Sequence, residues 1–215
     1  NGVTGLSIGD RVMCTGNCAY AEYAVTTAAR AWKVPGNNMS LEQAATLPVS
    51  LQTMHNAIVT AGRMVKGDAV LIQGASSGVG ILGMQIAKLM GARLVIGTST
   101  HEGRRAKLKE YGADMALDSS SPDWADKVLE ATNGEGVDLI VDQVSGGVMN
   151  DNLKATRILG RIVNVGRLGG FKGEFDFDLH ALRRIDYIGV TFRTRSEEEV
   201  AMIIAAMKAD LWEGV

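Results

Sequence analysis

The stretch QGASSGVG, residues 73–80, has residue types and spacing that could do chemistry. It follows the apolar run AVLI at residues 69–72 and precedes a segment with the apolar spacing of a helix. A glycine-rich turn between a strand and a helix offers free backbone N–H groups and the positive end of the helix dipole to a phosphate. Dinucleotide-binding motifs require this context, so the stretch predicts a nucleotide-binding loop.

The glycine motif can be aligned with this loop in two registers. Residues Gly78–Gly83 match the pattern G-x-G-x-x-G literally. The tight turn should, however, come directly after the strand, which favours a loop that begins at Gly74 or Ala75. In that register Gly78 lets the backbone approach a pyrophosphate, and Gly80 lets the helix pack closely on the strand.

The end of the following strand indicates which dinucleotide is bound. A site for NAD usually has Asp or Glu about 20 residues after the glycines, where the carboxylate binds the ribose 2′-hydroxyl. Here Thr98, Ser99 and Thr100 stand in its place, and Arg104 and Arg105 follow. Hydroxyl groups and a guanidinium suit a 2′-phosphate, so we predict NADPH in preference to NADH. The alternative is that both arginines lie on the solvated face of a helix.

The segments around the loop predict an α/β fold. Runs that are apolar throughout are typical of strands covered on both faces. Helices are expected between them, such as 78–91 and 104–113, and the last helix opens with the capping box Ser196-x-x-Glu199. The pattern predicts a Rossmann doubly wound parallel six-stranded sheet. Its expected strands are residues 69–74, 92–98, 115–118, 137–144, 161–166 and 185–192.

The residues before the sheet have a different pattern. Alternating apolar residues at 8–16 and 19–27 predict short antiparallel strands. Residues 39–62 predict a helical segment that Ser40 caps and that Pro48 kinks or restarts.

Composition argues against several classes of protein. The 215 residues have a formal net charge of −2, so there is no electrostatic case for nucleic acid or an anionic membrane as a partner. The longest apolar runs have the length of strands, not of a membrane span. Cys14 and Cys18 form one isolated pair, too few for a disulfide scaffold or a structural zinc site. We therefore expect a reducing, cytoplasmic setting.

The order of motifs along the chain resembles the medium-chain dehydrogenase/reductase superfamily, in its quinone oxidoreductase (zeta-crystallin-like) branch. The matching stretches are GVTGLSIGDRVM, AYAEYAV, EQAATLPVSLQT, VLIQGASSGVGILGMQIAKLMGA, KLKEYGAD, GRIVNVG and IGVTFRTRS. Short-chain dehydrogenases carry a similar glycine loop, but they need a Tyr-x-x-x-Lys pair that none of the four tyrosines provides.

The resemblance implies a GroES-like catalytic β domain followed by a Rossmann domain. Residues 1–38 would be a remnant of the catalytic domain, residues 39–67 connecting helices, and residues 68–215 the NADP-binding Rossmann domain. The chain would then begin late in the catalytic domain, as an N-terminally truncated member of the branch.

The resemblance also implies a set of cofactor-binding residues. The glycine loop would hold the pyrophosphate, the end of the second strand the 2′-phosphate, and the ends of the later strands the ribose and the nicotinamide. Core packing is an alternative role for Val144, Val165 and Phe192. The full set is Thr53, Ala75, Ser76, Ser77, Gly78, Val79, Gly80, Ser99, Arg104, Val144, Ser145, Val165, Gly166, Phe192 and Arg193.

The family also contains zinc enzymes, in which a Cys or an acidic residue four positions before a helix threonine binds the metal. Thr53 matches that threonine, and the ligand position is Val49, which cannot bind zinc. The resemblance therefore implies a zinc-independent reductase without a metal site. It would transfer hydride from NADPH to a small-molecule quinone or α,β-unsaturated carbonyl compound and form a homodimer through the edge of the Rossmann sheet.

Three other functions remain open from the sequence. The first is a non-catalytic, crystallin-like NADPH-binding protein, and the second is a relative of the zinc-type alcohol dehydrogenases. The third is a Rossmann methyltransferase, which would need an acidic residue at the end of the second strand. No residue is nominated as a catalytic acid, because water can protonate the product.

Overall fold

The structure is a computed structural model that describes residues 2–17, 20–36 and 39–211. The chain forms two compact units, the first unit (residues 1–52 and 192–215) and the second unit (residues 53–191). We predicted a Rossmann domain that continues to residue 215, whereas the last helix, α8 (Glu197–Leu211), groups with the first unit. An ion pair supports this grouping, because Glu197 Oε1 lies 2.8 Å from Arg30 Nη2.

The first unit contains a two-stranded antiparallel sheet of β1 (Val12–Cys14) and β2 (Ala31–Lys33). The expected strand at residues 19–27 is wrong, since residues 20–27 form no strand. The apolar side chains of that stretch, among them Tyr20 and Tyr23, are exposed. Their alternation therefore does not build a buried face, and the partner of β1 is the later segment around the buried Trp32.

Two consecutive helices follow this small sheet. α1 (Leu41–Ala45) begins with a capping box in which the Ser40 side chain accepts the N–H of Gln43. α2 (Leu47–His55) restarts the helix with Pro48 in its first turn, as predicted, since proline lacks only an N–H that is unpaired there. The chain then continues as one stretch of π-helix, η2 (Asn56–Ala61).

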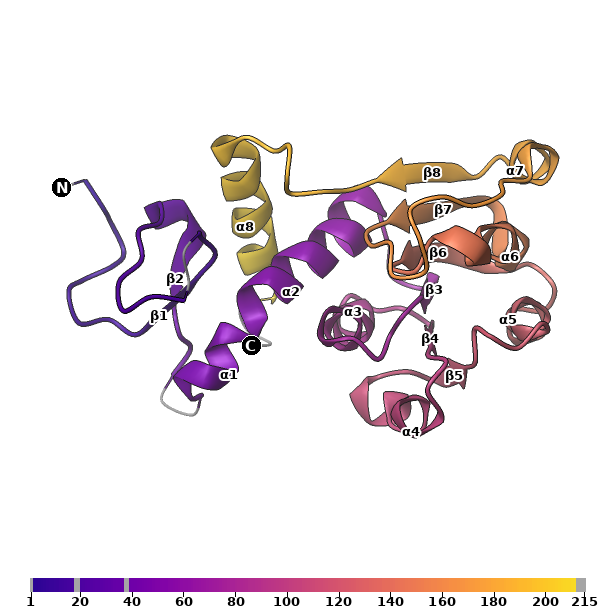
Figure 1. Ribbon diagram of the computed structural model, residues 1–215, viewed down its shortest axis with the longest axis horizontal. Coiled ribbons are helices and arrows are strands. Elements are labelled where there is room, and N and C mark those ends of the chain that lie inside the picture. The colour runs from indigo at the N-terminus through magenta and orange to yellow at the C-terminus, as the bar shows by residue number, and fades with distance from the viewer. Residues whose placement is uncertain (1, 18–19, 37–38, 212–215) are drawn as a thin grey trace. The chain divides into compact units, whose positions relative to one another are not determined.

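The second unit is a six-stranded parallel sheet in the order β5-β4-β3-β6-β7-β8, which confirms the predicted Rossmann topology. The helix α3 covers one face, and α5, α6 and α7 cover the other (Figure 1). The strands are β3 (Ala69–Ile72), β4 (Leu94–Thr98), β5 (Met115–Leu117), β6 (Val137–Asp142), β7 (Thr156–Asn164) and β8 (Asp186–Gly189). The helices are α3 (Gly78–Leu89), α5 (Trp124–Ala131), α6 (Met149–Ala155) and α7 (Phe177–Arg183).

The segment after β4 differs from the predicted helix over residues 104–113. α4 covers only Glu102–Arg105, and a separate 3₁₀ turn, η3 (Leu108–Tyr111), follows it. Leu108 is buried, and Gly112 ends the turn with a φ of +100°. The chain is therefore turned back toward β5 within a few residues, which a continuous helix would not allow.

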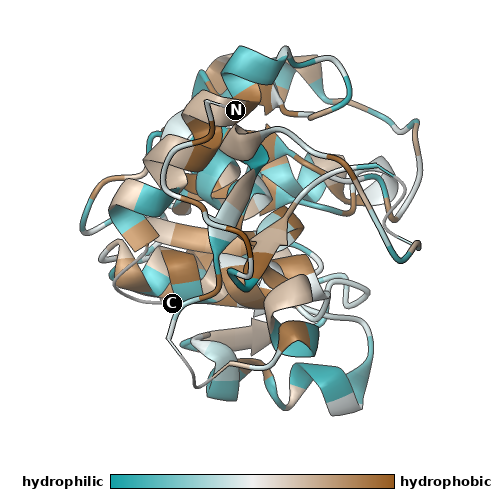
Figure 2. Ribbon diagram, turned by 90° about the vertical axis from the view of Figure 1, so that its left-hand side faces the viewer, coloured by the Kyte–Doolittle hydropathy of each residue, from teal (hydrophilic) through white to brown (hydrophobic). Residues whose placement is uncertain are grey.

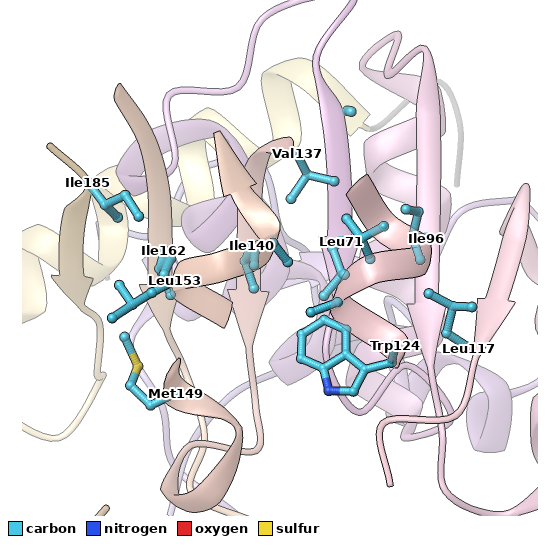
Figure 3. Close-up of a cluster of buried hydrophobic side chains, with 14 residues drawn as sticks. Leu71, Ile96, Leu117, Trp124, Val137, Ile140, Met149, Leu153, Ile162 and Ile185 are labelled. Carbon is cyan, nitrogen blue, oxygen red and sulfur yellow. The ribbon is translucent and has the colours of Figure 1, made fainter. Parts of the chain in front are cut away.

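A contiguous apolar core lies between the sheet and helices α5 and α6. Strand residues such as Leu71 and Ile140 meet Trp124 of α5 and Leu153 of α6 there (Figure 3). Every residue of β3 and β6 is buried, Asp138 and Asp142 of β6 included, as expected of strands that are covered on both faces. The helices carry hydrophilic and hydrophobic residues side by side, as helices with one buried face do (Figure 2).

None of the helices formed by the described residues has the length and apolar character that a membrane crossing requires.

The core predicts the relative cost of two identical substitutions. Leu153→Ala removes a fully buried side chain of α6 and should lower the free energy of unfolding by about 2–5 kcal/mol. Leu182→Ala on α7, where the side chain is 71% exposed, should change it by less than about 0.5 kcal/mol. Urea unfolding of both variants measures this difference, and equal losses would contradict the assigned core.

Candidate functional site

The turn between β3 and α3 is shaped by close backbone packing. Gly74 follows β3 with a φ of +70°, a conformation that favours glycine. A Cβ at Gly80 would lie 2.7 Å from Ala75 Cα and 2.7 Å from Gly74 O. This approach is the helix–strand contact that the second register of the loop predicts, so the loop begins directly after β3.

Ser77 caps α3 and stiffens the loop. Its hydroxyl oxygen accepts the N–H of Gly80 at 3.0 Å. The same hydroxyl lies 3.0 Å from Gly74 O and 3.1 Å from Gln143 Oε1, either of which can accept its proton. The structure thus gives Ser77 a structural task within the loop, beside its predicted contact with a phosphate.

The surroundings of Gly78 fit a bound phosphate. A Cβ at Gly78 would meet no atom within 4 Å, so the space beside the first turn of α3 is open. Within the helix, the N–H groups of Gly78 and Val79 have no carbonyl partner, because they belong to the first turn. Open space, free donors and the positive end of a twelve-residue helix form a cradle of the kind that binds a pyrophosphate.

The end of β4 lies against this cradle. Ser99 Oγ is 2.9 Å from Ser76 Oγ, so two predicted cofactor residues from the loops after β4 and β3 are brought together. Arg104 is exposed, and its N–H donates to Nδ1 of His101 at the start of α4. The predicted residues Ser76, Ser99 and Arg104 therefore lie in one region, in which Ser99 is buried and Arg104 is exposed.

Arg105 has a different role from Arg104. Its guanidinium donates to Ser99 O at 2.8 Å and to Asp118 Oδ2 at 3.0 Å. Hydrogen bonds from Ser120 and the neighbouring charge of Arg105 lower the pKa of Asp118. Arg105 thus ties the end of β4 to the end of β5, whereas Arg104 is exposed.

The loops after β6 and β7 are joined to each other. Ser145 Oγ donates to Gly166 O at 2.8 Å, and the N–H of Val165 donates to Asp142 O at 2.8 Å. A Cβ at Gly166 would lie 2.6 Å from Gln143 O, so only glycine fits there. The predicted residues of these two loops therefore form one continuous rim at the carboxyl ends of the strands.

Two buried residues of this rim were not predicted. Gln143 Nε2 donates to Gln73 O at 3.0 Å, which connects the loop after β6 with the glycine loop after β3. Asp142 is fully buried, and this burial raises its pKa, while the N–H groups of Ser145 and Val144 oppose the shift. The sequence signal was available, since both are polar residues at the carboxyl end of a predicted buried strand.

The remaining predicted residues lie elsewhere. Thr53, on α2, is partly buried at the start of the second unit. Phe192 and Arg193 belong to the first unit, where they line a pocket together with Arg30 and Arg195. Their contacts with a cofactor stay predictions.

The fold and the site define a protein of the Rossmann class, with an anion cradle at the point where the strand order reverses. The family model described as zinc-binding dehydrogenase matches residues 78–208. The chain belongs to this family, within the medium-chain dehydrogenase/reductase superfamily, as the resemblance predicted.

Several relatives cover most of this chain. The highly reducing polyketide synthase phiA of a fungal species (strain ATCC 74256) is 32% identical over 167 residues, which is 77% of this chain and 6% of the relative. The quinone oxidoreductase of Rattus norvegicus is 27% identical over 216 residues, which is 100% of this chain and 64% of the relative. The chain thus spans less than two thirds of either relative's length.

Solved structures agree with this assignment. The structure of mycobacterial Rv1454c complexed with NADPH is 27% identical with a TM-score of 0.83, and the match covers 98% of this chain and 65% of that chain. The apo JamJ enoyl reductase is 26% identical with a TM-score of 0.78, and the match covers 99% and 61%.

The family's name raises the question of zinc. Val49 occupies the predicted ligand position and offers no ligand atom. Cys14 is exposed, and Cys18 lies outside the described residues. Throughout residues 2–17, 20–36 and 39–211, no three His, Cys, Asp or Glu side chains are grouped to hold a metal ion. These described residues do not fit a zinc site.

Two neighbouring glycines predict opposite effects of the same substitution. Gly80→Ala should lower the free energy of unfolding by about 1–3 kcal/mol, because the added methyl group collides with the backbone at Ala75. Gly78→Ala should leave it unchanged or raise it by up to about 1 kcal/mol, as alanine favours a helix. The same Gly78→Ala methyl group should weaken NADPH binding about tenfold, or about 1.4 kcal/mol, because it fills the cradle.

Thermal melts and NADPH titrations of both variants measure these effects. Unchanged NADPH affinity in Gly78→Ala would contradict the cradle.

Proposed function

We propose that this chain is the cofactor-binding part of a zinc-independent, NADPH-dependent reductase of quinones or α,β-unsaturated carbonyl compounds. The observation that carries the proposal is the end of β4. There Ser99 and the exposed Arg104 lie next to the open cradle at Gly78, and the sequence has no carboxylate at the position that binds a ribose 2′-hydroxyl. A 2′-phosphate would find a hydroxyl donor and a guanidinium there.

The relatives support both the proposed cofactor and the proposed substrate class. A structure similar to this chain along 98% of its length is a complex with NADPH. The other similar proteins include a quinone oxidoreductase, an enoyl reductase and a highly reducing polyketide synthase, and each of these names refers to a reduction or an oxidoreductase. The two substrate classes share the same chemistry, since both accept a hydride at a carbon conjugated with a carbonyl.

The chain's own residues would bind and orient the cofactor. Bound NADPH supplies the hydride, and the protein supplies geometry and exclusion of water. Residues Ala75–Gly80 would hold the pyrophosphate, and Ser99 with Arg104 the 2′-phosphate. The rim formed by Val144, Ser145, Val165 and Gly166 would position the ribose and the nicotinamide. Thr53, Phe192 and Arg193 are proposed as further contacts at the nicotinamide end.

The preference for NADPH depends on Arg104 in this account. Arg104→Ala should raise the dissociation constant of NADPH about 10- to 100-fold, since hydrogen bonds to charged groups contribute about 1.5–3 kcal/mol. The dissociation constant of NADH should stay the same. Arg93→Ala is the matched control, because it removes an equally charged and partly exposed side chain at the opposite end of β4. A wild-type protein that binds NADH as tightly as NADPH would contradict the assignment.

Turnover separates a reductase from a non-catalytic NADPH-binding protein. The protein is incubated with NADPH and a panel of quinones and enones, and loss of NADPH absorbance is followed. Reduction of at least one panel member supports the reductase. Tight NADPH binding without any turnover by the full-length protein would favour the crystallin-like alternative, whereas this chain alone is expected to bind NADPH without its catalytic partner domain.

We propose further that two copies associate through β8. This strand is the edge of the sheet and pairs with β7 on one side. Nearby aromatic side chains are exposed, with Tyr187 at 45% and Phe177 at 77%. An open edge with apolar neighbours is usually covered in the native state. Sedimentation at micromolar concentration should give a dimer, and Tyr187→Lys should shift it toward the monomer.

A further inference from the structure

Four fully buried polar side chains form a hydrogen-bonded chain beneath the carboxyl ends of β3, β4 and β6. They are Thr98, Gln73, Asn152 and Asp142, each with an exposed fraction of 0%. Thr98 Oγ1 donates to Gln73 Oε1 at 2.6 Å, and Gln73 Nε2 donates to Asn152 Oδ1 at 2.8 Å. Asn152 Nδ2 then donates to Asp142 Oδ2 at 3.2 Å.

Each end of this buried chain holds the backbone of a predicted cofactor loop. At one end, the N–H of Gly74 donates to Thr98 Oγ1 at 3.1 Å. At the other end, Asp142 Oδ1 accepts the N–H groups of Val144 and Ser145 at 2.8 and 2.9 Å. The four hydrogen bonds from Gly74 to Asp142 all donate in the same direction, toward the carboxylate, and hydrogen bonds in such a series strengthen one another in a low dielectric.

The loop held by Asp142 has an unusual backbone. Ser145 has φ +57° and ψ −153°, a region that glycine occupies far more readily than other residues. Such a conformation persists only where the surroundings fix it. Here Asp142 holds the N–H of Ser145, and Gly166 O accepts its hydroxyl at 2.8 Å.

The position of the buried polar residues is informative. Deeper in the same strands the residues are apolar, such as Leu71, Ile96 and Ile140, and they pack in the core. Burying four polar side chains costs free energy unless all of them are paired, and apolar residues would fill a core at less cost. The polar chain lies where the strands end and the cofactor loops begin.

We infer that Thr98, Gln73, Asn152 and Asp142 are positioning residues that fix the loop after β3 relative to the loop after β6. A dinucleotide that spans these loops would then find both sides of its site preformed. This inference rests on the proposed function, because NADPH is the ligand that the two loops would share. None of the four side chains is exposed, so they act through the backbone and not by touching the cofactor.

A matched pair of variants separates positioning from general stability. Thr98→Val removes the hydroxyl that joins Gly74 to Gln73. Thr156→Val removes an equally buried hydroxyl, which donates to Asn152 O at 2.7 Å at the amino end of β7. The melting temperature should fall by a similar amount in both variants. NADPH affinity, measured by cofactor fluorescence, should fall about tenfold in Thr98→Val and stay within about twofold of wild type in Thr156→Val.

The double variant Thr98→Val/Asn152→Leu tests whether the links act as one unit. The NADPH affinity of the double variant should equal that of whichever single variant binds NADPH more weakly, because one substitution already interrupts the series of hydrogen bonds. Losses that multiply would show separate local effects and overturn the inference, as would unchanged affinity in Thr98→Val. Wild-type protein that fails to bind NADPH would overturn the proposed function itself. Wild-type binding with an unaffected Thr98→Val variant would leave the function standing and reject only the positioning role.

Discussion

The parallel pairing of β3 with β6 is the constraint on which the second unit depends. These two strands are buried along their whole length and lie next to each other although 64 residues separate Ile72 from Val137, so the chain passes from one half of the sheet to the other between them. Open α/β sheets bind ligands at the carboxyl ends of the strands where the strand order reverses, and the loops after β3 and β6 leave the sheet at that point. The glycine cradle, the serine pair of residues 76 and 99, and the rim after β6 and β7 all follow from that single arrangement.

Much of the second unit could be predicted from local sequence. The central strands β3 and β6 are buried along their whole length, and burial on both faces explains why they show no strict alternation. The edge strand β8 is mostly exposed and shows no such burial. The register of the glycine loop followed from the need for a tight turn directly after β3, and the contact of Gly80 with Ala75 agrees with it. Local signals also predicted the restart of the helix at Pro48, because proline acts through its own backbone.

What could not be predicted depends on contacts between distant residues. The alternating stretch at residues 19–27 resembles a strand, but no surface buries its apolar side chains. Arg104 and Arg105 are indistinguishable in the sequence, and only the approach of Asp118 shows that Arg105 is engaged. The buried chain that joins Gln73 to Asn152 links residues 79 positions apart. The sequence shows polar residues at the ends of the strands, but it does not show which residues they bind.

The central claim is that one crevice, at the carboxyl ends of β3, β4 and β6, binds NADPH. Amide chemical-shift mapping of the labelled chain during an NADPH titration tests it most directly. We predict saturable shifts concentrated at residues 74–80, 98–105 and 143–147, with smaller shifts along the amino ends of the same strands. Shifts centred on another surface, or no saturable shifts at all, would contradict the account.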